Sequence, residues 1–245
     1  MKILLAPAET KNSGGNDRTF CKENFCFPEL FEKREEIFNI YENLLSSSSI
    51  EELSKWFGLK KLDDVKKYKG SLKDKASMMA INRYDGVAFD ALEYNSLDKD
   101  SQDYINKNVI IFSNLFGPLY ASDLIPDYKY KQGAKLPNIN VEKFYYDNFT
   151  EALNDFVGEE VIDLRAGFYE KFYKVKKSDV ITFKFIKDGK VVSHWAKYYR
   201  GKVLQEIAKN KIANHSQFME IEIPGLKLNE IQEKKNIKTL IMDIV

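Results

Sequence analysis

Residues Val109 to Pro118 read VIIFSNLFGP and decide the fold class. The run from Val109 to Ser113 is apolar and has the length of a buried strand, and Asn114 to Pro118 has the composition of a tight turn. Two other short apolar runs, Lys2 to Ala6 and Val161 to Leu164, predict buried strands of the same kind. Short buried strands this far apart in the chain predict a sheet that is assembled from distant segments.

Helices are predicted between the first two strands. Pro28 suits the first turn of a helix, whose apolar face comprises Leu30, Ile37, Tyr41, Leu44 and Leu45. Ser49 and Glu52 have the spacing of a capping box that opens a second helix, and Gly58 can close it before a third begins. Two short helices around Gly58 are compatible with a helix-hairpin-helix, a unit that grips DNA phosphates through backbone amides. A glycine between two helices is more often only a C-cap.

The second half of the chain mixes both periodicities. Its predicted helices are Phe144 to Phe156 and Tyr198 to Asn210, and its predicted strands are Val180 to Ile186, Val191 to Ala196, Met219 to Ile223 and Thr239 to Ile244. Asp188 and Gly189 fit the two-residue turn of a hairpin. No segment is rich enough in linker residues to divide the chain. We therefore predict an α+β fold with one domain, residues 1–245, in which helices surround a central sheet.

Composition excludes several classes of protein. Of the 245 residues, 44% are hydrophobic, which suits a folded globule, but no stretch approaches the ~20 apolar residues of a membrane span. The apolar run after Lys2 is too short for a signal peptide. Cys21 and Cys26 do not form a disulfide framework in a chain of this length. We expect a cytoplasmic protein without a membrane partner and favour a monomer, although the pattern does not determine the oligomeric state.

The inventory of metal ligands is small. His194 and His215 are the two histidines, and neither follows a glutamate at the spacing of a carboxylate-bridged iron site. Cys21 and Cys26 are too widely spaced for a zinc knuckle and have no partner pair. The sequence therefore predicts neither a metal site nor a cofactor.

Positive charge is concentrated in one segment. Residues 165–211 contain thirteen basic and four acidic residues, a net charge of +9, whereas the whole chain carries only +1. Aromatic residues are interleaved with these lysines, a pattern compatible with phosphate contacts and stacking of unpaired bases. The alternative is a solvated lysine-rich face with aromatic residues that belong to the core. Charge alone leaves both interpretations open.

Several segments resemble a known family. They are Ala6-Pro7-Ala8-Glu9-Thr10-Lys11, the element from Tyr84 to Leu92, the stretch from Phe112 to Lys129, and Ser193 to Gly201. In order along the chain, these are similar to the Ser-Pro-Ala-Lys-Thr opening and later motifs of the YaaA family of bacterial peroxide-stress proteins. Glu9 stands where the family usually has lysine, and Tyr120 and Ala121 replace an Arg-Pro pair, which indicates a divergent branch.

The resemblance implies a single mixed α/β body that binds double-stranded DNA through a positive cleft and limits damage from free intracellular iron. The basic segment and its neighbours then supply the phosphate contacts. The residues that we predict for this role are Lys11, Lys129, Lys171, Lys174, Lys176, Lys197, Arg200 and Lys202. Duplex DNA is the expected partner rather than a single strand.

An enzyme acting on a nucleic-acid base or nucleotide is the alternative hypothesis. The family-like segments bring polar residues from distant parts of the chain toward one candidate cleft, as catalytic sites often do. These residues are Thr10, Ser113, Asp123, Tyr128 and Tyr169. A lysine near Asp123 could act as base or nucleophile, although Asp123 also suits a plain turn or capping role. No catalytic residue is assigned, and the reaction class stays open.

Overall fold

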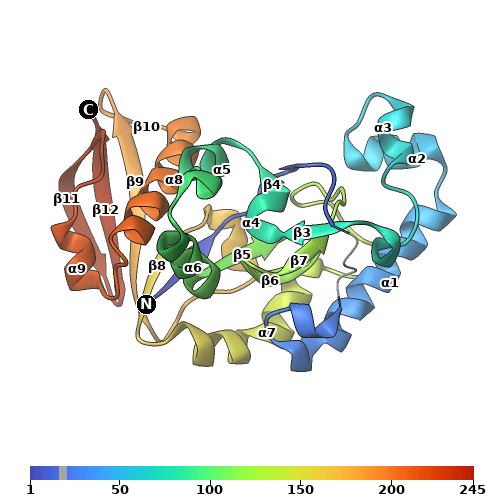
Figure 1. Ribbon diagram of the computed structural model, residues 1–245, viewed down its shortest axis with the longest axis horizontal. Coiled ribbons are helices and arrows are strands. Elements are labelled where there is room, and N and C mark those ends of the chain that lie inside the picture. Colours follow the sequence, from blue (N-terminus) through green and yellow to red (C-terminus); the bar gives the residue numbers. More distant parts are fainter. Residues whose placement is uncertain (17–20) are drawn as a thin grey trace.

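A computed structural model describes residues 1–16 and 21–245. Its largest element is an eight-stranded sheet (Figure 1). In chain order the strands are β1 (Lys2–Leu5), β5 (Val109–Ser113), β6 (Gly117–Tyr120), β8 (Glu160–Leu164), β9 (Asp179–Lys187), β10 (Lys190–Val191), β11 (Leu226–Lys234) and β12 (Ile237–Ile244). Two smaller pairings join β2 (Thr10–Lys11) to β4 (Tyr84–Asp85) and β3 (Ser77–Met79) to β7 (Leu124–Pro126).

The central strands of the large sheet are parallel. In space the order is β11, β12, β9, β8, β1, β5 and β6, with β10 paired to β9. Strand β1 lies between β8 and β5 and is parallel to both, so that Leu5 is opposite Leu164 on one side and Ile111 on the other. The outer pairs, β11 with β12 and β5 with β6, are antiparallel. All five residues of β5 are buried, as expected for a strand covered on both faces.

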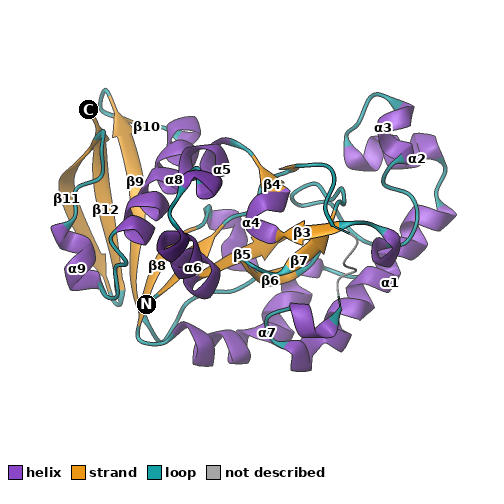
Figure 2. Ribbon diagram, viewed as in Figure 1, coloured by secondary structure: helices purple, strands orange, loops and turns teal. Residues whose placement is uncertain are grey.

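Helices surround this sheet (Figure 2). The α-helices are α1 (Phe31–Ser47), α2 (Ile50–Phe57), α3 (Leu62–Lys66), α4 (Ala80–Arg83), α5 (Val87–Leu92), α6 (Lys99–Asn108), α7 (Val141–Val157), α8 (Ser193–Lys209) and α9 (His215–Glu220). Short 3-10 helices are η1 (Lys22–Asn24), η2 (Pro28–Leu30), η3 (Leu72–Asp74), η4 (Tyr94–Ser96) and η5 (Gly167–Lys171). In Figure 1, α6 and α8 cross in front of the sheet, α7 runs beneath it, and α1 to α3 occupy the end away from β11.

The structure confirms the α+β class and the local signals around the first helices. Strand β5 has the predicted bounds, and β1 is one residue shorter than predicted. The Ser49 hydroxyl accepts a hydrogen bond from the Glu52 amide at 3.1 Å, and the Glu52 carboxylate accepts one from the Ser49 amide at 2.8 Å. Gly58 ends α2 in the left-handed conformation, with φ of 68°.

The predicted strand from Val191 to Ala196 is wrong. Pairing with β9 stops at Val191, and α8 begins at Ser193. The apolar residues of this segment alternate over a few positions, but Ala196, Tyr199 and Val203 continue at helical spacing and are buried. Packing of this longer helical face against β9 and α5 outweighs the short strand pattern.

The predicted strand from Met219 to Ile223 is also wrong, because Met219 and Glu220 belong to helix α9 and the next three residues form no strand. The Asn214 side chain caps α9 by accepting a hydrogen bond from the Gln217 amide at 2.9 Å, and Phe218 packs on Phe183 with ring centroids 5.8 Å apart. Strand β11 was not predicted. It lies at the sheet edge and is almost entirely exposed, so its sequence carries little apolar signal.

The contact of α5 with α8 depends on a glycine. A Cβ atom added at Gly201 of α8 would overlap the carbonyl of Ala88 in α5. The two helices can therefore approach each other only while this position has no side chain.

We predict that Gly201→Ala lowers the free energy of unfolding by about 1–3 kcal/mol, because the helices must separate to admit the methyl group. Urea denaturation followed by circular dichroism measures this change. Gly167→Ala is the matched control, because a Cβ at Gly167 meets nothing within 4 Å. Equal stability of the two variants would contradict the packing argument.

Candidate functional site

Three chain segments meet where the central parallel strands end. Strands β1, β5 and β8 finish at Leu5, Ser113 and Leu164, and their register places these ends at one edge of the sheet. The next residues of each segment include Lys11, Asn114 and Tyr169. The carboxyl edge of a parallel sheet is where open α/β proteins bind ligands. This edge therefore holds the candidate site.

Lys11 has an unusual environment at this edge. Its side chain is half-buried, and its amine lies 4.1 Å from the centroid of the Tyr128 ring and 5.5 Å from that of Tyr84. It donates a hydrogen bond of 3.3 Å to the Glu9 carbonyl. Burial and then repulsion from Lys129 lower the pKa of Lys11 to about 7, although Asp127 and Glu9 oppose the shift. Near neutral pH, much of this amine is therefore unprotonated.

Three hydroxyl groups form a buried chain beside Lys11. The Tyr84 and Tyr128 hydroxyls are 2.8 Å apart, and the Tyr128 hydroxyl is also 2.8 Å from the Ser113 Oγ. Ser113 Oγ accepts hydrogen bonds from the amides of Leu115 and Phe116. Burial raises the pKa of Tyr84 to about 12 and holds that of Tyr128 well above its usual value, so both phenols stay protonated and can donate. Ser113 and Tyr128 were predicted for this cleft, whereas Tyr84 was not.

Tyr169 and Asn114 extend the cluster. Tyr169 is buried, and burial raises the pKa of its hydroxyl, an effect that a hydrogen bond with Asn114 opposes. The Asn114 amide oxygen is buried and has no hydrogen-bond partner among the residues that the structure describes. Asn114 was missed because a polar residue after a strand usually indicates only a turn. Thr10, on β2, is exposed at the rim.

Asp123 serves the turn between β6 and β7. Its carboxylate accepts hydrogen bonds from the amides of Cys26 at 2.9 Å and Tyr120 at 3.0 Å. Burial raises its pKa to about 6, against the effects of these hydrogen bonds and of buried Arg34. The described contacts do not join Asp123 to Lys11, so it has the turn role that was predicted as its alternative.

The predicted phosphate contacts separate into two groups. Lys171, Lys174, Lys176 and Lys197 are exposed, and none of them forms an ion pair within the described part of the chain. Lys202, by contrast, pairs with Glu93 at 2.9 Å. Arg200 is half-buried, and burial lowers its pKa against the attraction of Asp163. Lys129 is partly exposed.

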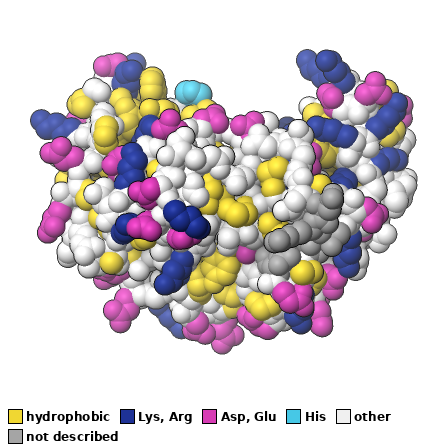
Figure 3. Space-filling view, viewed as in Figure 1, with side chains coloured by type: hydrophobic (Ala, Val, Ile, Leu, Met, Phe, Trp, Pro, Cys, Tyr) yellow, Lys and Arg dark blue, Asp and Glu magenta, His cyan; other side chains and the backbone are white. Residues whose placement is uncertain are grey.

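The turn between α2 and α3 is basic, but two of its backbone amides already donate hydrogen bonds within the protein. Lys55, Lys60, Lys61 and Lys67 are exposed on these helices and the turn. Figure 3 shows dark-blue side chains gathered over this end of the molecule, across a hollow in the outline from the α5 and α8 end. The Gly58 amide donates to the Lys55 carbonyl, and the Leu59 amide donates to the Ser54 carbonyl. These two amides are therefore not free for phosphate, and the lysine side chains are the better candidates.

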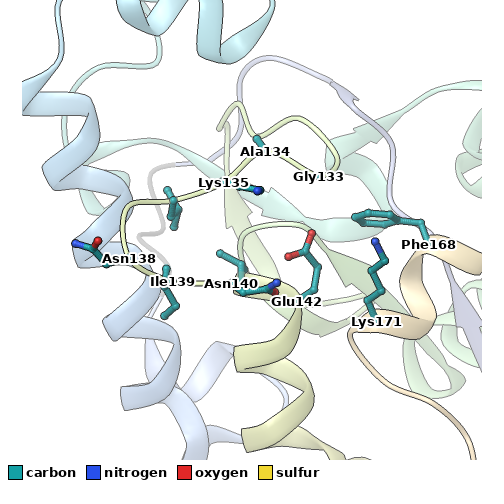
Figure 4. Close-up of a pocket in the computed structure, with 11 residues that line it drawn as sticks. Gly133, Ala134, Lys135, Asn138, Ile139, Asn140, Glu142, Phe168 and Lys171 are labelled. Carbon is teal, nitrogen blue, oxygen red and sulfur yellow. The ribbon is translucent and has the colours of Figure 1, made fainter.

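A pocket of about 500 Å³ lies beside η5. Residues 133–142 form most of its wall, and Phe168 and Lys171 complete it (Figure 4). Glu142, at the start of α7, faces these two residues across the opening. The Lys171 amine lies 4.8 Å from the centroid of the Phe168 ring. The pocket thus offers an aromatic ring and charges of both signs next to predicted phosphate contacts.

Two other features bear on the site's chemistry. Within residues 1–16 and 21–245, no three or more His, Cys, Asp or Glu side chains are grouped closely enough to hold a metal ion. Cys26 is buried, and burial raises the pKa of its thiol. Cys21 is exposed.

No helix among the described residues is both long and apolar enough to cross a membrane.

Comparison with known proteins identifies the family. Residues 1–232 match the family described as peroxide stress protein YaaA. The chain belongs to the YaaA family. An uncharacterised protein of Campylobacter jejuni is 43% identical over 246 positions that cover both chains completely. A UPF0246 protein of Corynebacterium glutamicum is 32% identical over 99% of this chain and all of its own length. A UPF0246 protein of Fusobacterium nucleatum is 26% identical over 96% and 97% of the two chains.

Glu9 and Tyr120, two of the positions at which this chain departs from the usual YaaA-family pattern, are accommodated locally. The Glu9 carboxylate accepts a hydrogen bond from the Gln132 amide at 3.3 Å, which connects the segment after β1 to the residue before Gly133 of the pocket wall. Tyr120 packs edge-on against Phe156 of α7, with ring centroids 5.3 Å apart. Neither departure removes Lys11 or the hydroxyl groups of Tyr84, Tyr128 and Ser113 beside it.

We predict that Lys11 titrates with a pKa near 7 and that Lys129→Gln raises this pKa, because the substitution removes a repelling charge. The folded protein then binds fewer protons than the unfolded chain between pH ~7 and ~10.5, so stability should rise with pH in that window. Heteronuclear NMR of the lysine side chains measures the pKa directly. An inflection above pH 10 in the native protein would contradict this environment, and Lys197→Gln, at an exposed site, is the control.

Proposed function

We propose that this YaaA-family protein binds duplex DNA through its backbone phosphates and thereby limits iron-dependent oxidative DNA damage in the cytoplasm. The observation that supports this most directly is the set of exposed lysines on and after η5, none of which forms an ion pair with a residue that the structure describes. Lysine side chains without a carboxylate partner bind phosphate without first breaking an ion pair. The counterions that they displace from the DNA drive association.

Ion pairing and burial reduce the number of residues that we propose as phosphate contacts. Lys171, Lys174 and Lys176 lie close together in sequence, and Lys197 lies near the start of α8. Lys202 has a reduced role because phosphate would compete with Glu93. Lys11 is also a weak phosphate contact, because a buried amine with a pKa near 7 carries only part of a charge. The exposed lysines of α2, α3 and their connecting turn supply a second basic surface across the hollow seen in Figure 3.

The test measures binding of a short labelled duplex, and of its single strand, by fluorescence anisotropy over a salt series. The variant is Lys171→Gln/Lys174→Gln/Lys176→Gln. If each lysine contacts one phosphate of the duplex, the log–log salt slope should become shallower by roughly 2.7, or about 0.9 per contact. Affinity at low salt should fall with it.

The matched control removes the same charge from lysines that already have partners, as Lys33→Gln/Lys99→Gln/Lys209→Gln. It should leave the slope close to that of the native protein. Equal losses in the two variants would mean that net charge alone is responsible, and a flat salt response of the native protein would reject DNA binding through phosphates.

One observation favours catalysis as a second function. The half-buried amine of Lys11, with hydroxyl groups beside it at the carboxyl edge of the sheet, has the arrangement of a reactive site rather than of a phosphate contact. An enzyme acting on a nucleic-acid component is therefore the alternative to binding alone.

A further inference from the structure

The Lys11 amine has few hydrogen-bond partners for a half-buried group. It has three donors when protonated, but its hydrogen bond goes to a single acceptor, the Glu9 carbonyl. Among the described residues it forms no ion pair. Its other neighbours are the faces of Tyr128 and Tyr84. Burial with a single acceptor favours the neutral amine, which is the nucleophilic form.

Groups for proton transfer stand next to the amine. The linked hydroxyls of Tyr84, Tyr128 and Ser113 can pass a proton along 2.8 Å hydrogen bonds. Both phenols hold their protons at neutral pH because burial raises their pKa values. Loss of water from the adduct of an amine and a carbonyl needs a proton donor, and a protonated phenol can donate one. The arrangement is therefore suited to imine chemistry.

We propose that Lys11 is the nucleophile of an imine-forming site whose substrate is an aldehyde, namely the ring-opened sugar of an abasic site in duplex DNA. The choice of DNA rests on the proposed function. An abasic sugar is the component of DNA that presents a free aldehyde, and it lacks the base that would add bulk beside the half-buried amine. Lys129 is close enough to depress the Lys11 pKa and so favours the nucleophilic form of the amine.

The reaction balances without an oxidant or a reductant. The Lys11 nitrogen adds to the aldehyde carbon, and the adduct loses one water as the imine forms. The imine makes the proton on sugar carbon 2 more acidic, and water accepts this proton. The electron pair forms a double bond between carbons 2 and 3, and the bond from carbon 3 to the phosphate oxygen breaks. Hydrolysis then returns the free lysine and an unsaturated aldehyde, and the DNA strand is cleaved.

The experiment traps the imine with sodium cyanoborohydride, which reduces it to a stable secondary amine. Native protein is incubated with a labelled duplex that carries one abasic site, and the covalent product is measured on a denaturing gel and mapped by mass spectrometry. We expect an adduct at Lys11, and strand cleavage when the reductant is omitted. In Lys11→Gln and Lys11→Arg, both products should fall to background.

Two controls keep the result interpretable. Lys99→Gln removes a lysine of α6 that is paired with Asp103 and should retain trapping, whereas equal loss there would overturn the assignment to Lys11. Thermal unfolding of the Lys11 variants, and their anisotropy with an intact duplex, show whether folding and DNA binding persist. A folded Lys11 variant that binds DNA and still gives full trapping would also overturn the proposal.

A further experiment compares a free sugar aldehyde with the aldehyde of an abasic duplex. It also tests imine formation separately from DNA binding. If free 2-deoxyribose 5-phosphate is trapped at Lys11 but the abasic duplex is not, the assignment of DNA as substrate is wrong. If the native protein binds an intact duplex but traps neither probe, imine chemistry is rejected while DNA binding stands. If it binds no duplex, the proposed function fails independently of the Lys11 result.

Discussion

The pairing of β1 between β8 and β5 is the constraint on which the rest of the structure depends. Leu5 lies opposite both Leu164 and Ile111, so three segments that are far apart in sequence end at one edge. The strands are short and almost wholly buried, which means that their stability comes from apolar burial on both faces. A shift of register by one residue would turn each apolar side chain to the opposite face and separate the polar residues that follow.

The site follows from that pairing, but its chemistry comes from burial. The strands bring Lys11, Ser113 and Tyr169 to one edge, and Tyr128 and Tyr84 pack around them. On an exposed surface the same lysine would be an ordinary cation. Here burial and repulsion from Lys129 favour its neutral form. The same residue types thus acquire a different role because the fold removes water from them.

Features that depend on interactions between residues close in sequence could be predicted, and features that depend on distant residues could not. Strand β5 and the Ser49–Glu52 capping box were predicted correctly because their signals are local. The start of α8 was not, because the short alternation after Val191 competes with a helical face whose packing partners lie in β9 and α5. In the site, Ser113 and Tyr128 could be proposed as candidates from their segments. The lowered pKa of Lys11 could not be predicted, because it depends on burial and on the neighbouring Lys129, which arise only in the fold.

The net charge of residues 165–211 is a poor guide to phosphate binding for a related reason. The same reason limits what can bind at Lys11. The +9 of residues 165–211 includes Lys202 and Lys211, whose carboxylate partners Glu93 and Asp100 lie outside that segment. Net charge therefore overstates the positive field, and only the unpaired lysines are available to phosphate. A phosphate held directly between Lys129 and Lys11 would cancel the repulsion that keeps the Lys11 pKa low and would make the amine a cation. Nucleophilic chemistry at Lys11 thus requires phosphates to bind at the exposed lysines around the site, while a neutral carbonyl group reaches the amine itself.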